Sequence, residues 1–443
     1  MRVRIALKTI IFILIFTITL TVITGVLVTV DNLGYQNIAS FYEEPEGSLD
    51  AVYIGSSNCF VFWNSLLAWE EYGISVFPYA CNSNLFYSTE YLIKETKKTQ
   101  PDALFIVNIN SLTDGEVNIQ QFRNLIDCMP FSLNKLALIN HLADIGDYSF
   151  SERLEFYFPI IRYHTRWTEI SSTDFSNELN GLKGASTFES YLKVSNDVTS
   201  TYVTTDAKAT LSDKLVSSTG SLLDYCDKEN VNVLFVTVPQ SRGNEYDMSR
   251  YNAVNAMIEE RGYTVLDLTE RIEEMGIDLT TDYYNGGHTN IHGSIKLTYF
   301  LSEYLIEHYG FTDKRTNDDY SNWNSSYKKY ADIISPYILD FETDSGVRTD
   351  FLEAPSLKLE KDDANAILTW NDIAKADGYI IYRQISADSA WERLCETTEV
   401  TYTVSLPEKE ETHYYTVVPF LEENGCRYYG DYFYEGIELT ASQ

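Results

Sequence analysis

Two polar segments that lie far apart in the chain contain residues able to carry out nucleophilic chemistry together. Gly55-Ser-Ser-Asn58 directly follows a short apolar run, and His288 ends the loop-forming segment Asp282-Tyr-Tyr-Asn-Gly-Gly-His288. A serine hydroxyl becomes a nucleophile when a histidine lies within hydrogen-bond reach. The competing interpretation is that Ser56 or Ser57 only caps the next helix and that His288, like most of the six histidines, is structural.

The elements around these segments predict a three-layer α/β domain with a parallel sheet. Short apolar runs that alternate with helical patterns are typical of strands buried on both faces. Ligands bind beyond the carboxyl ends of such strands, so Ser57 and His288 are expected at one edge of the sheet. The expected strands are Ala51–Ile54, Ile74–Phe77, Ala103–Val107, Val231–Val238 and Tyr263–Leu268, and the expected helices are Phe86–Lys98, Tyr251–Arg261 and Ile291–Tyr309.

The region from about 115 to 208 interrupts this alternation and is predicted to be a helical insertion that covers the sheet edge as a lid or substrate wall. It includes an expected helix at Ser132–Ile145 and the segment Tyr163-His-Thr-Arg-Trp167. One interpretation is that His164 and Arg166 clamp an anionic or hydroxyl-rich substrate while Trp167 stacks on a sugar ring. The other is that Arg166 pairs with an acidic neighbour and Trp167 packs inward.

After a linker at 313–353, residues 354–443 predict an all-β sandwich. Four alternating runs, Ala366–Trp370, Gly378–Arg383, Thr401–Val404 and Tyr414–Phe420, are separated by turn-forming or charged stretches. The pattern resembles a fibronectin type III module, with Trp370 at the buried tryptophan position and Tyr415 at the tyrosine corner. That resemblance implies strands that keep Cys395 and Cys426 too far apart for a disulfide.

The first 31 residues predict a cytoplasmic tip and a transmembrane signal anchor. Three basic residues precede an uncharged stretch from Thr9 to Val30, whose 22 residues span about 33 Å as a helix. The basic flank is expected to stay in the cytoplasm. We therefore expect a single-pass protein of the cell membrane with the bulk of the chain extracellular, and late cleavage of the segment is the alternative.

Composition excludes some classes of function. Lys and Arg total 33 against 65 Asp and Glu, and the formal net charge of −32 disfavours nucleic-acid binding. The six cysteines form no C-x-x-C pair and stand at no metal-ligand spacing with histidine. We expect neither a metal nor a cofactor.

The segments together resemble the SGNH/GDSL hydrolases. Gly55-Ser-Ser-Asn58 is similar to the first sequence block of that superfamily and Asn285-x-x-His288 to the last, over about residues 48–310. Within the superfamily, the chain most resembles the membrane-anchored branch related to teichoic-acid D-alanylation and polysaccharide O-acylation in Gram-positive bacteria. Further segments with this similarity are Gly73–Tyr79, Asn124–Ser132, Tyr163–Trp167 and His288–Ser294.

The resemblance implies a role for each matching residue. Ser57 would be the nucleophile and His288 the general base. The backbone N–H groups of Ser57 and Ala80, with the Asn110 side chain, would form the oxyanion hole. The substrate-binding residues would be Asn58, Asn84, His164, Arg166 and Trp167.

The chain departs from the family pattern at three positions. Asn285 replaces the usual aspartate three residues before the histidine, Ala80 replaces a glycine, and Asn108-Ile-Asn110-Ser111 replaces Gly-x-Asn-Asp. An amide orients an imidazole but does not stabilise imidazolium as a carboxylate does, so a Ser–His dyad is expected. Asp282 is the alternative support for the histidine.

Two functions are the main candidates, and a surface adhesin is the least favoured third option. The first is an extracytoplasmic serine esterase or O-acyltransferase that acts on acyl groups of a cell-wall or capsular polysaccharide, and the resemblance implies a multispanning membrane-bound O-acyltransferase as partner. The second is a catalytically inactive SGNH-like assembly or glycan-binding protein. A separation above about 5 Å between Ser57 Oγ and His288 would favour the second function, because it exceeds even the loose hydrogen bonds of unliganded sites.

Overall fold

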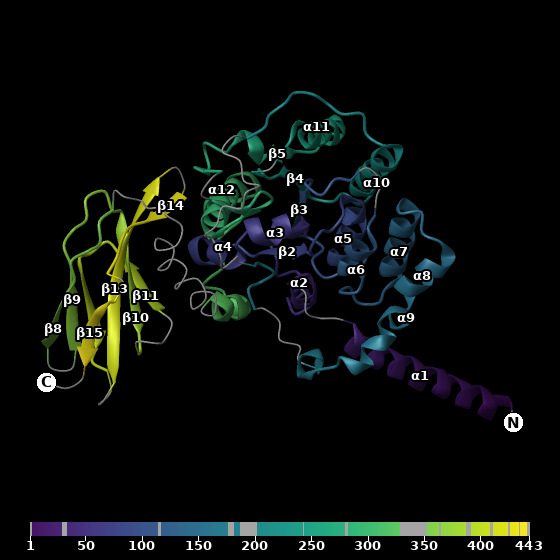
Figure 1. The fold of residues 1–443 in the computed structure, drawn as a ribbon, viewed down its shortest axis with the longest axis horizontal. Helices are drawn as coiled ribbons and strands as arrows, with labels where there is room; N and C mark the ends of the chain where they lie inside the picture. The colour runs from purple at the N-terminus through teal and green to yellow at the C-terminus, as the bar shows by residue number, and fades with distance from the viewer. Residues whose placement is uncertain are drawn as a thin grey trace.

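The computed structural model combines an N-terminal apolar helix, an α/β domain and a C-terminal all-β domain (Figure 1). It describes residues 2–28, 33–113, 117–175, 181–186, 202–241, 243–279, 282–327, 352–362, 365–386, 391–407, 411–423, 426–433 and 435–440. The fold class expected from the sequence, α/β followed by all-β after an apolar helix, is confirmed at this level.

The α/β domain is built on a five-stranded sheet with the order β2-β1-β3-β4-β5, and every pair of neighbours is parallel. The strands β1, β2, β3 and β4 are fully buried, which explains why they appear in the sequence as continuous apolar runs. Their bounds are β1 (Ala51–Gly55), β2 (Val76–Ala80), β3 (Leu104–Asn108), β4 (Val233–Thr237) and β5 (Val265–Asp267).

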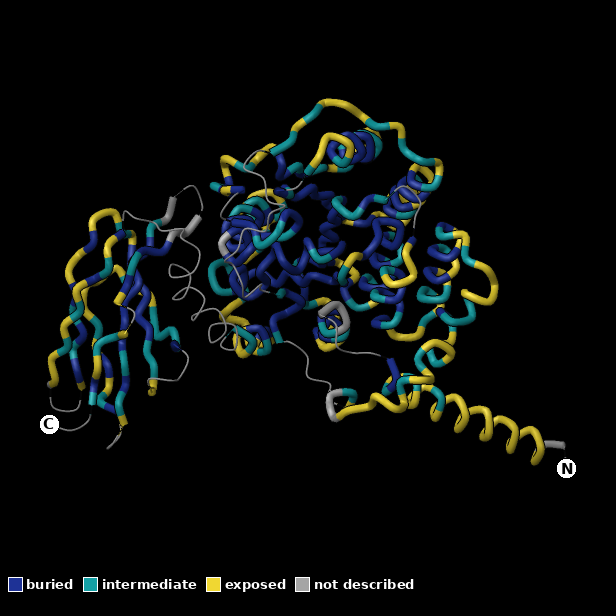
Figure 2. Tube along the Cα trace, viewed as in Figure 1, coloured by how far each residue is buried: buried dark blue, intermediate teal, exposed yellow. Residues whose placement is uncertain are grey.

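Alternate side chains of the strands enter two separate cores, so helices cover both faces of the sheet. Val52 and Phe105 pack into one core with α5 and α10, whereas Tyr53 and Ile106 pack into the other with α3 and α12. Figure 2 shows the strands as the buried centre of this domain. The helices of the domain are α2 (Leu33–Phe41), α3 (Ser57–Phe62), α4 (Ser65–Tyr72), η1 (Phe86–Ser88), α5 (Thr89–Thr96), α10 (Asp213–Glu229), α11 (Glu245–Glu260), η4 (Leu268–Glu270), α12 (Ile291–Tyr309) and η5 (Asp318–Tyr320).

Between β3 and α10 the chain forms a helical region, as the sequence predicted. The boundaries of the predicted insertion, 115 and 208, stay predictions, because residues 176–180 and 187–201 lie outside the described part. The helices are α6 (Ile119–Ile126), α7 (Leu133–Ile145), α8 (Phe150–Tyr157), α9 (Ile160–Tyr163), η2 (His164–Thr168) and η3 (Ser172–Phe175).

The C-terminal domain consists of two antiparallel sheets, one with strand order β11-β10-β13-β14 and β15 paired to β13, the other β12-β9-β8. Trp370 is buried between them and packs edge-on against Tyr379. Strands β10 and β13 separate the strands of Cys395 and Cys426, as expected. The strands are β8 (Lys358–Asp362), β9 (Asn365–Thr369), β10 (Gly378–Gln384), β11 (Glu392–Thr397), β12 (Thr401–Ser405), β13 (Thr412–Glu423), β14 (Cys426–Tyr429) and β15 (Ile437–Thr440).

The N-terminal helix α1 (Arg2–Leu27) projects from the α/β domain, and Figure 2 shows it exposed along most of its length. Its segment Arg4–Leu27 is the one described helix that is long and apolar enough to cross a membrane, with a mean hydropathy of 2.7. A signal sequence near an N-terminus can meet the same criteria of length and hydropathy.

Candidate active site

Ser57 lies at the carboxyl end of β1, where the chain enters α3. The turn requires close packing, because a Cβ on Gly55 would lie 2.5 Å from Cys59 Sγ and 2.8 Å from Asn108 Cβ. Ser57 itself is half-buried, whereas the α3 residues after it are buried in the core. The serine is therefore held by rigid surroundings at the surface of the sheet edge.

His288 belongs to a small antiparallel hairpin formed by β6 (Tyr283–Asn285) and β7 (His288–Thr289). Two hydrogen bonds attach this hairpin to the sheet edge. The Tyr283 hydroxyl donates to Pro239 O at 2.8 Å, and Thr289 Oγ1 donates to Val61 O of α3 at 3.3 Å. The hairpin thus carries the histidine to the helix that begins with Ser57.

The two side chains meet. Ser57 Oγ lies 2.8 Å from His288 Nε2, and His288 Nδ1 lies 3.0 Å from Asn285 Oδ1. Asn285 Oδ1 also accepts the Gly287 backbone N–H at 2.9 Å, which identifies it as the amide oxygen. Because this oxygen only accepts, Nδ1 carries the imidazole proton and the lone pair of Nε2 faces the serine hydroxyl. This is the tautomer that a general base requires.

Asp282, the alternative support for the histidine, is occupied elsewhere. Its buried carboxylate accepts a hydrogen bond from Lys296 Nζ at 2.8 Å and from the Asp278 backbone N–H at 2.8 Å. Burial raises the pKa of this carboxyl, although Lys296 opposes the shift. In the structure, Asn285 is the residue that orients the imidazole.

The pair opens into a pocket of about 360 Å³ lined mostly by uncharged polar side chains. Three of the predicted site residues line it besides Ser57 and His288, namely Asn58, Asn84 and Asn110. Ala80 is buried in the core at the end of β2, opposite Gly55. A pocket of this composition suits a ligand rich in hydroxyl groups.

The three asparagines differ in what their amides do. Asn84 Nδ2 donates to Gly55 O at 3.0 Å, and the Asn110 amide exchanges two 2.8 Å hydrogen bonds with the Val238 backbone. Both therefore position the loops around the pocket. Asn58 Oδ1 accepts from the Ser56 hydroxyl at 3.2 Å, but its buried Nδ2 has no hydrogen-bond partner within the described part of the chain.

One wall of the pocket consists of residues that were not predicted from the sequence. Gln240 follows β4, and Asn244, Asp247 and Arg250 lie on or just before the first turns of α11. Arg250 Nη2 pairs with Asp247 Oδ1 at 2.5 Å and its guanidinium lies 4.8 Å from the Tyr246 ring centroid. The rule that ligands bind beyond strand carboxyl ends could have identified Gln240, which lies three residues after β4.

His164, Arg166 and Trp167 do not line the pocket around Ser57. The structure places them in η2, where Arg166 Nη1 donates to Leu27 O of α1 at 2.6 Å and Nη2 pairs with Asp174 at 2.7 Å. His164 Nδ1 lies 2.8 Å from Ile161 O, and Trp167 is exposed. The interpretation that Arg166 pairs with an acidic neighbour describes this geometry, whereas Trp167 does not pack inward.

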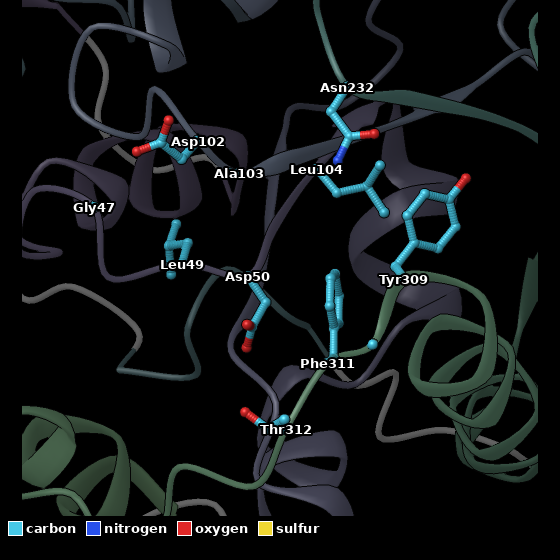
Figure 3. Close-up of a pocket in the computed structure, with 11 residues that line it drawn as sticks. Gly47, Leu49, Asp50, Asp102, Ala103, Leu104, Asn232, Tyr309, Phe311 and Thr312 are labelled. Atoms are coloured by element: carbon cyan, nitrogen blue, oxygen red, sulfur yellow. The ribbon is translucent and has the colours of Figure 1, made fainter.

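A second pocket, of about 320 Å³, lies at the opposite edge of the sheet, where β1, β3 and β4 begin (Figure 3). Its Asp50 bonds to Lys314 Nζ at 2.5 Å and to Ser75 at 2.8 Å, so the charged group acts structurally. Among the described residues, no three His, Cys, Asp or Glu side chains gather in a way that could hold a metal ion.

No protein-family model and no curated protein matches the chain. Solved structures similar to it include an Fn3-like protein from Clostridium thermocellum (22% identity, 19% of this chain and 90% of that one, TM-score 0.16) and the fn3 domain of human collagen alpha-1(XX) chain (16% identity, 22% and 94%, TM-score 0.18). The structure of titin kinase and its flanking domains matches at 20% identity over 19% of this chain and 16% of that one, with a TM-score of 0.16. The first two of these structures are fibronectin type III or Fn3-like domains.

Proposed function

We propose that the chain is an extracytoplasmic serine esterase or O-acyltransferase that acts on the acyl groups of a cell-wall or capsular polysaccharide. One observation carries the proposal: Ser57 Oγ lies 2.8 Å from the unprotonated Nε2 of a histidine whose other nitrogen is held by Asn285. A nucleophile, a base and an orienting group in this relation are the requirement for covalent acyl transfer.

The reaction proceeds in two steps. His288 Nε2 takes the Ser57 hydroxyl proton while Oγ attacks the ester carbonyl carbon. The alkoxide of the substrate then leaves, receives that proton from His288, and the acyl group stays on Ser57 as an ester. In the second step His288 deprotonates water, in a hydrolase, or a sugar hydroxyl, in a transferase, and this oxygen attacks the acyl carbon. The Ser57 oxygen then leaves and takes the proton back from His288, which restores the resting pair.

The negative charge that develops on the carbonyl oxygen needs hydrogen-bond donors. Asn58 Nδ2 is a buried donor, has no partner within the described chain and belongs to a residue that lines the pocket next to Ser57. A donor that is already desolvated and has no other partner contributes most when it binds a charge that appears only in the transition state. We assign Asn58 to this role, because the Asn110 side chain is committed to Val238.

The pocket supports a carbohydrate substrate. Serine, threonine, asparagine and glutamine side chains dominate its wall. The charges of Asp247 and Arg250 cancel, because the two side chains form an ion pair. Such a wall exchanges hydrogen bonds with sugar hydroxyls without requiring a charged ligand. Anchoring by α1 would keep this pocket outside the cell near the membrane, where the family resemblance implies a multispanning membrane-bound O-acyltransferase as acyl donor.

The alternative, an inactive glycan-binding relative, is favoured by one observation, the amide at Asn285 in place of a carboxylate. The same amide nevertheless fixes the tautomer that a base needs, and the serine lies well within the 5 Å limit set above. The geometry therefore supports the enzyme more strongly than the binding protein.

Hydrolysis of an aryl acetate by the full chain in detergent tests the proposal. We expect Ser57→Ala and His288→Ala each to lower kcat by about 10³-fold or more. Ser217→Ala and His308→Ala, which change an exposed serine on α10 and an exposed histidine on α12, are matched controls that should retain the rate. Full activity of either site variant, with the fold preserved, would contradict the enzyme and leave the binding function.

A further inference from the structure

Five large apolar side chains are exposed together in the short segment from Phe158 to Phe175. Trp167 is 70% exposed and Phe175 67%, and the other three members, Phe158, Ile161 and Ile170, are also exposed. We call these five residues the interfacial surface. Exposed apolar groups at this density usually mark a contact with a partner or a membrane.

The interfacial surface lies at the C-terminal end of α1. Helix α9 and the turns η2 and η3 all contact α1, and Figure 1 shows α9 beside the point where α1 leaves the domain. The Arg166 guanidinium donates to Leu27 O at 2.6 Å, so it caps the last turn of α1. The exposed apolar groups are thus fixed next to the end of the apolar helix.

The length of α1 places this end at a membrane boundary. The span Arg4–Leu27 has 24 residues, or about 36 Å of helix, slightly more than the hydrocarbon core of a bilayer. If Arg4 lies at one surface, Leu27 and the segment attached to it lie at the other. Tryptophan and other aromatic residues are enriched at this depth, where the apolar tails meet the headgroups.

The local charge also favours a membrane. In a chain with 65 acidic residues, the segment 158–175 has no net charge, because Arg162 and Arg166 balance Glu169 and Asp174. Arg166 pairs with Asp174, whereas Arg162 is exposed beside Ile161. A neutral aromatic segment is repelled less by anionic lipid headgroups than the acidic remainder of the protein, and the exposed Arg162 guanidinium can pair with a lipid phosphate.

We propose that the interfacial surface inserts into the headgroup region of an anionic bilayer and gives the α/β domain a second attachment besides α1. The inference rests on the anchoring role of α1 in the proposed function. Two attachments fix the tilt of the domain, and therefore the direction in which the pocket around Ser57 faces relative to the membrane.

The tryptophans of the chain allow a direct test. Trp167 is exposed, whereas the other five, Trp63, Trp69, Trp323, Trp370 and Trp391, are buried. The full chain is reconstituted into nanodiscs of phosphatidylcholine and phosphatidylglycerol, with or without bromine atoms on the upper acyl chains. We expect the brominated lipid to quench part of the tryptophan emission, and we expect that quenched part to disappear in Trp167→Phe.

A matched control places a tryptophan on the far domain. Ile385 is an exposed apolar residue of the sandwich, so Ile385→Trp in the Trp167→Phe background should show no bromine quenching. Equal emission of the original chain in brominated and ordinary discs overturns the proposal. Quenching that is as strong in discs of phosphatidylcholine alone overturns its electrostatic part.

The same measurement separates this inference from the proposed function. Ser57→Ala should show unchanged quenching, so a failure of catalysis leaves the membrane contact standing. If the chain separates from the discs on gel filtration, α1 is not inserted in the membrane. That result overturns the premise that α1 anchors the protein, on which the second attachment also depends.

Discussion

At the scale of single residues, the candidate site depends on a neutral amide. Asn285 accepts two hydrogen bonds, from Gly287 N–H and from the imidazole, and so sets the ring orientation and the tautomer. It does not carry the negative charge that would stabilise imidazolium after proton transfer. The site is therefore well oriented but electrostatically incomplete.

Asn285→Asp should raise kcat for aryl acetate. The new carboxylate can keep both accepted hydrogen bonds and adds the negative charge that stabilises imidazolium. We expect a gain of about tenfold or more. Steady-state kinetics measure this gain in kcat. Asn285→Ala is the matched control, because it removes the side chain that orients the imidazole. An unchanged rate in the aspartate variant, with intact folding, would show that imidazolium is not formed in the limiting step.

At the scale of elements, the hairpin that carries His288 depends on a buried ion pair behind it. Asp282 and Lys296 are both almost fully buried, and Lys296 Nζ also donates to Gly276 O at 2.7 Å. Removing one partner of such a pair leaves an uncompensated charge in the interior, which costs far more than the pair contributes.

Lys296→Met should destabilise the α/β domain by about 3–5 kcal/mol at neutral pH. Burial raises the pKa of Asp282, so the folded state takes up a proton at higher pH than the unfolded state does. Acidification therefore stabilises the folded variant. The stability that Lys296→Met loses relative to the original chain should decrease as the pH falls through the pKa that Asp282 has in the folded state. Thermal melting at several pH values measures this.

The double variant Asp282→Asn with Lys296→Met provides the control for that prediction. It removes both charges, so most of the lost stability should return and the dependence of the deficit on pH should disappear. If the loss of stability in Lys296→Met does not change with pH, the assignment of the pH dependence to the Asp282 carboxyl is contradicted.

Most elements of the α/β domain could be predicted because their signals are local. The expected helix Ile291–Tyr309 coincides with α12, and the buried strands differ from the expected runs by only a few residues at their ends. Strand β2 is shifted toward Ala80, because Pro78 and Tyr79 continue the strand beyond the apolar run that ends at Phe77. The pairing of Ser57 with His288 followed from the common edge of parallel strands.

Other parts of the site depend on tertiary contacts that leave no pattern in the sequence. The aromatic and basic character of 163–167 is equally compatible with a sugar clamp and with a contact to α1, and only the bond from Arg166 to Leu27 O distinguishes them. Likewise, the residue pattern of α11 does not show whether Arg250 lies on a side of the helix that faces a pocket or on a side that faces solvent.

At the scale of the whole molecule, the sandwich packs against the α/β domain through a polar contact surrounded by aromatic residues. Arg393 of β11 bonds to Glu70 of α4 and, at 3.2 Å, to the Tyr327 hydroxyl. Phe420 and Tyr429 of the sandwich belong to the same buried cluster as Trp323 of the α/β domain. None of these residues lines the pocket around Ser57.

Deleting residues 352–443 should therefore leave kcat/KM for a small aryl ester unchanged, although it uncovers part of the aromatic cluster and lowers solubility. Arg393→Ala in the full chain is the milder comparison, because it breaks the contact without removing the domain. Loss of small-ester turnover in the deletion, with the α/β fold preserved by circular dichroism, would mean that the sandwich completes the site.

The start of α2 at Leu33 sets a limit on which polymers the pocket can meet. Only five residue steps separate Leu33 from Val28, next to the end of α1, and a fully extended chain covers about 3.6 Å per step, or about 18 Å in all. For a chain held by α1, the α/β domain cannot move far from the membrane. Under the proposed function, its acceptors would be polysaccharide chains close to the lipid surface, and polymers further out would be reached only if they fold back.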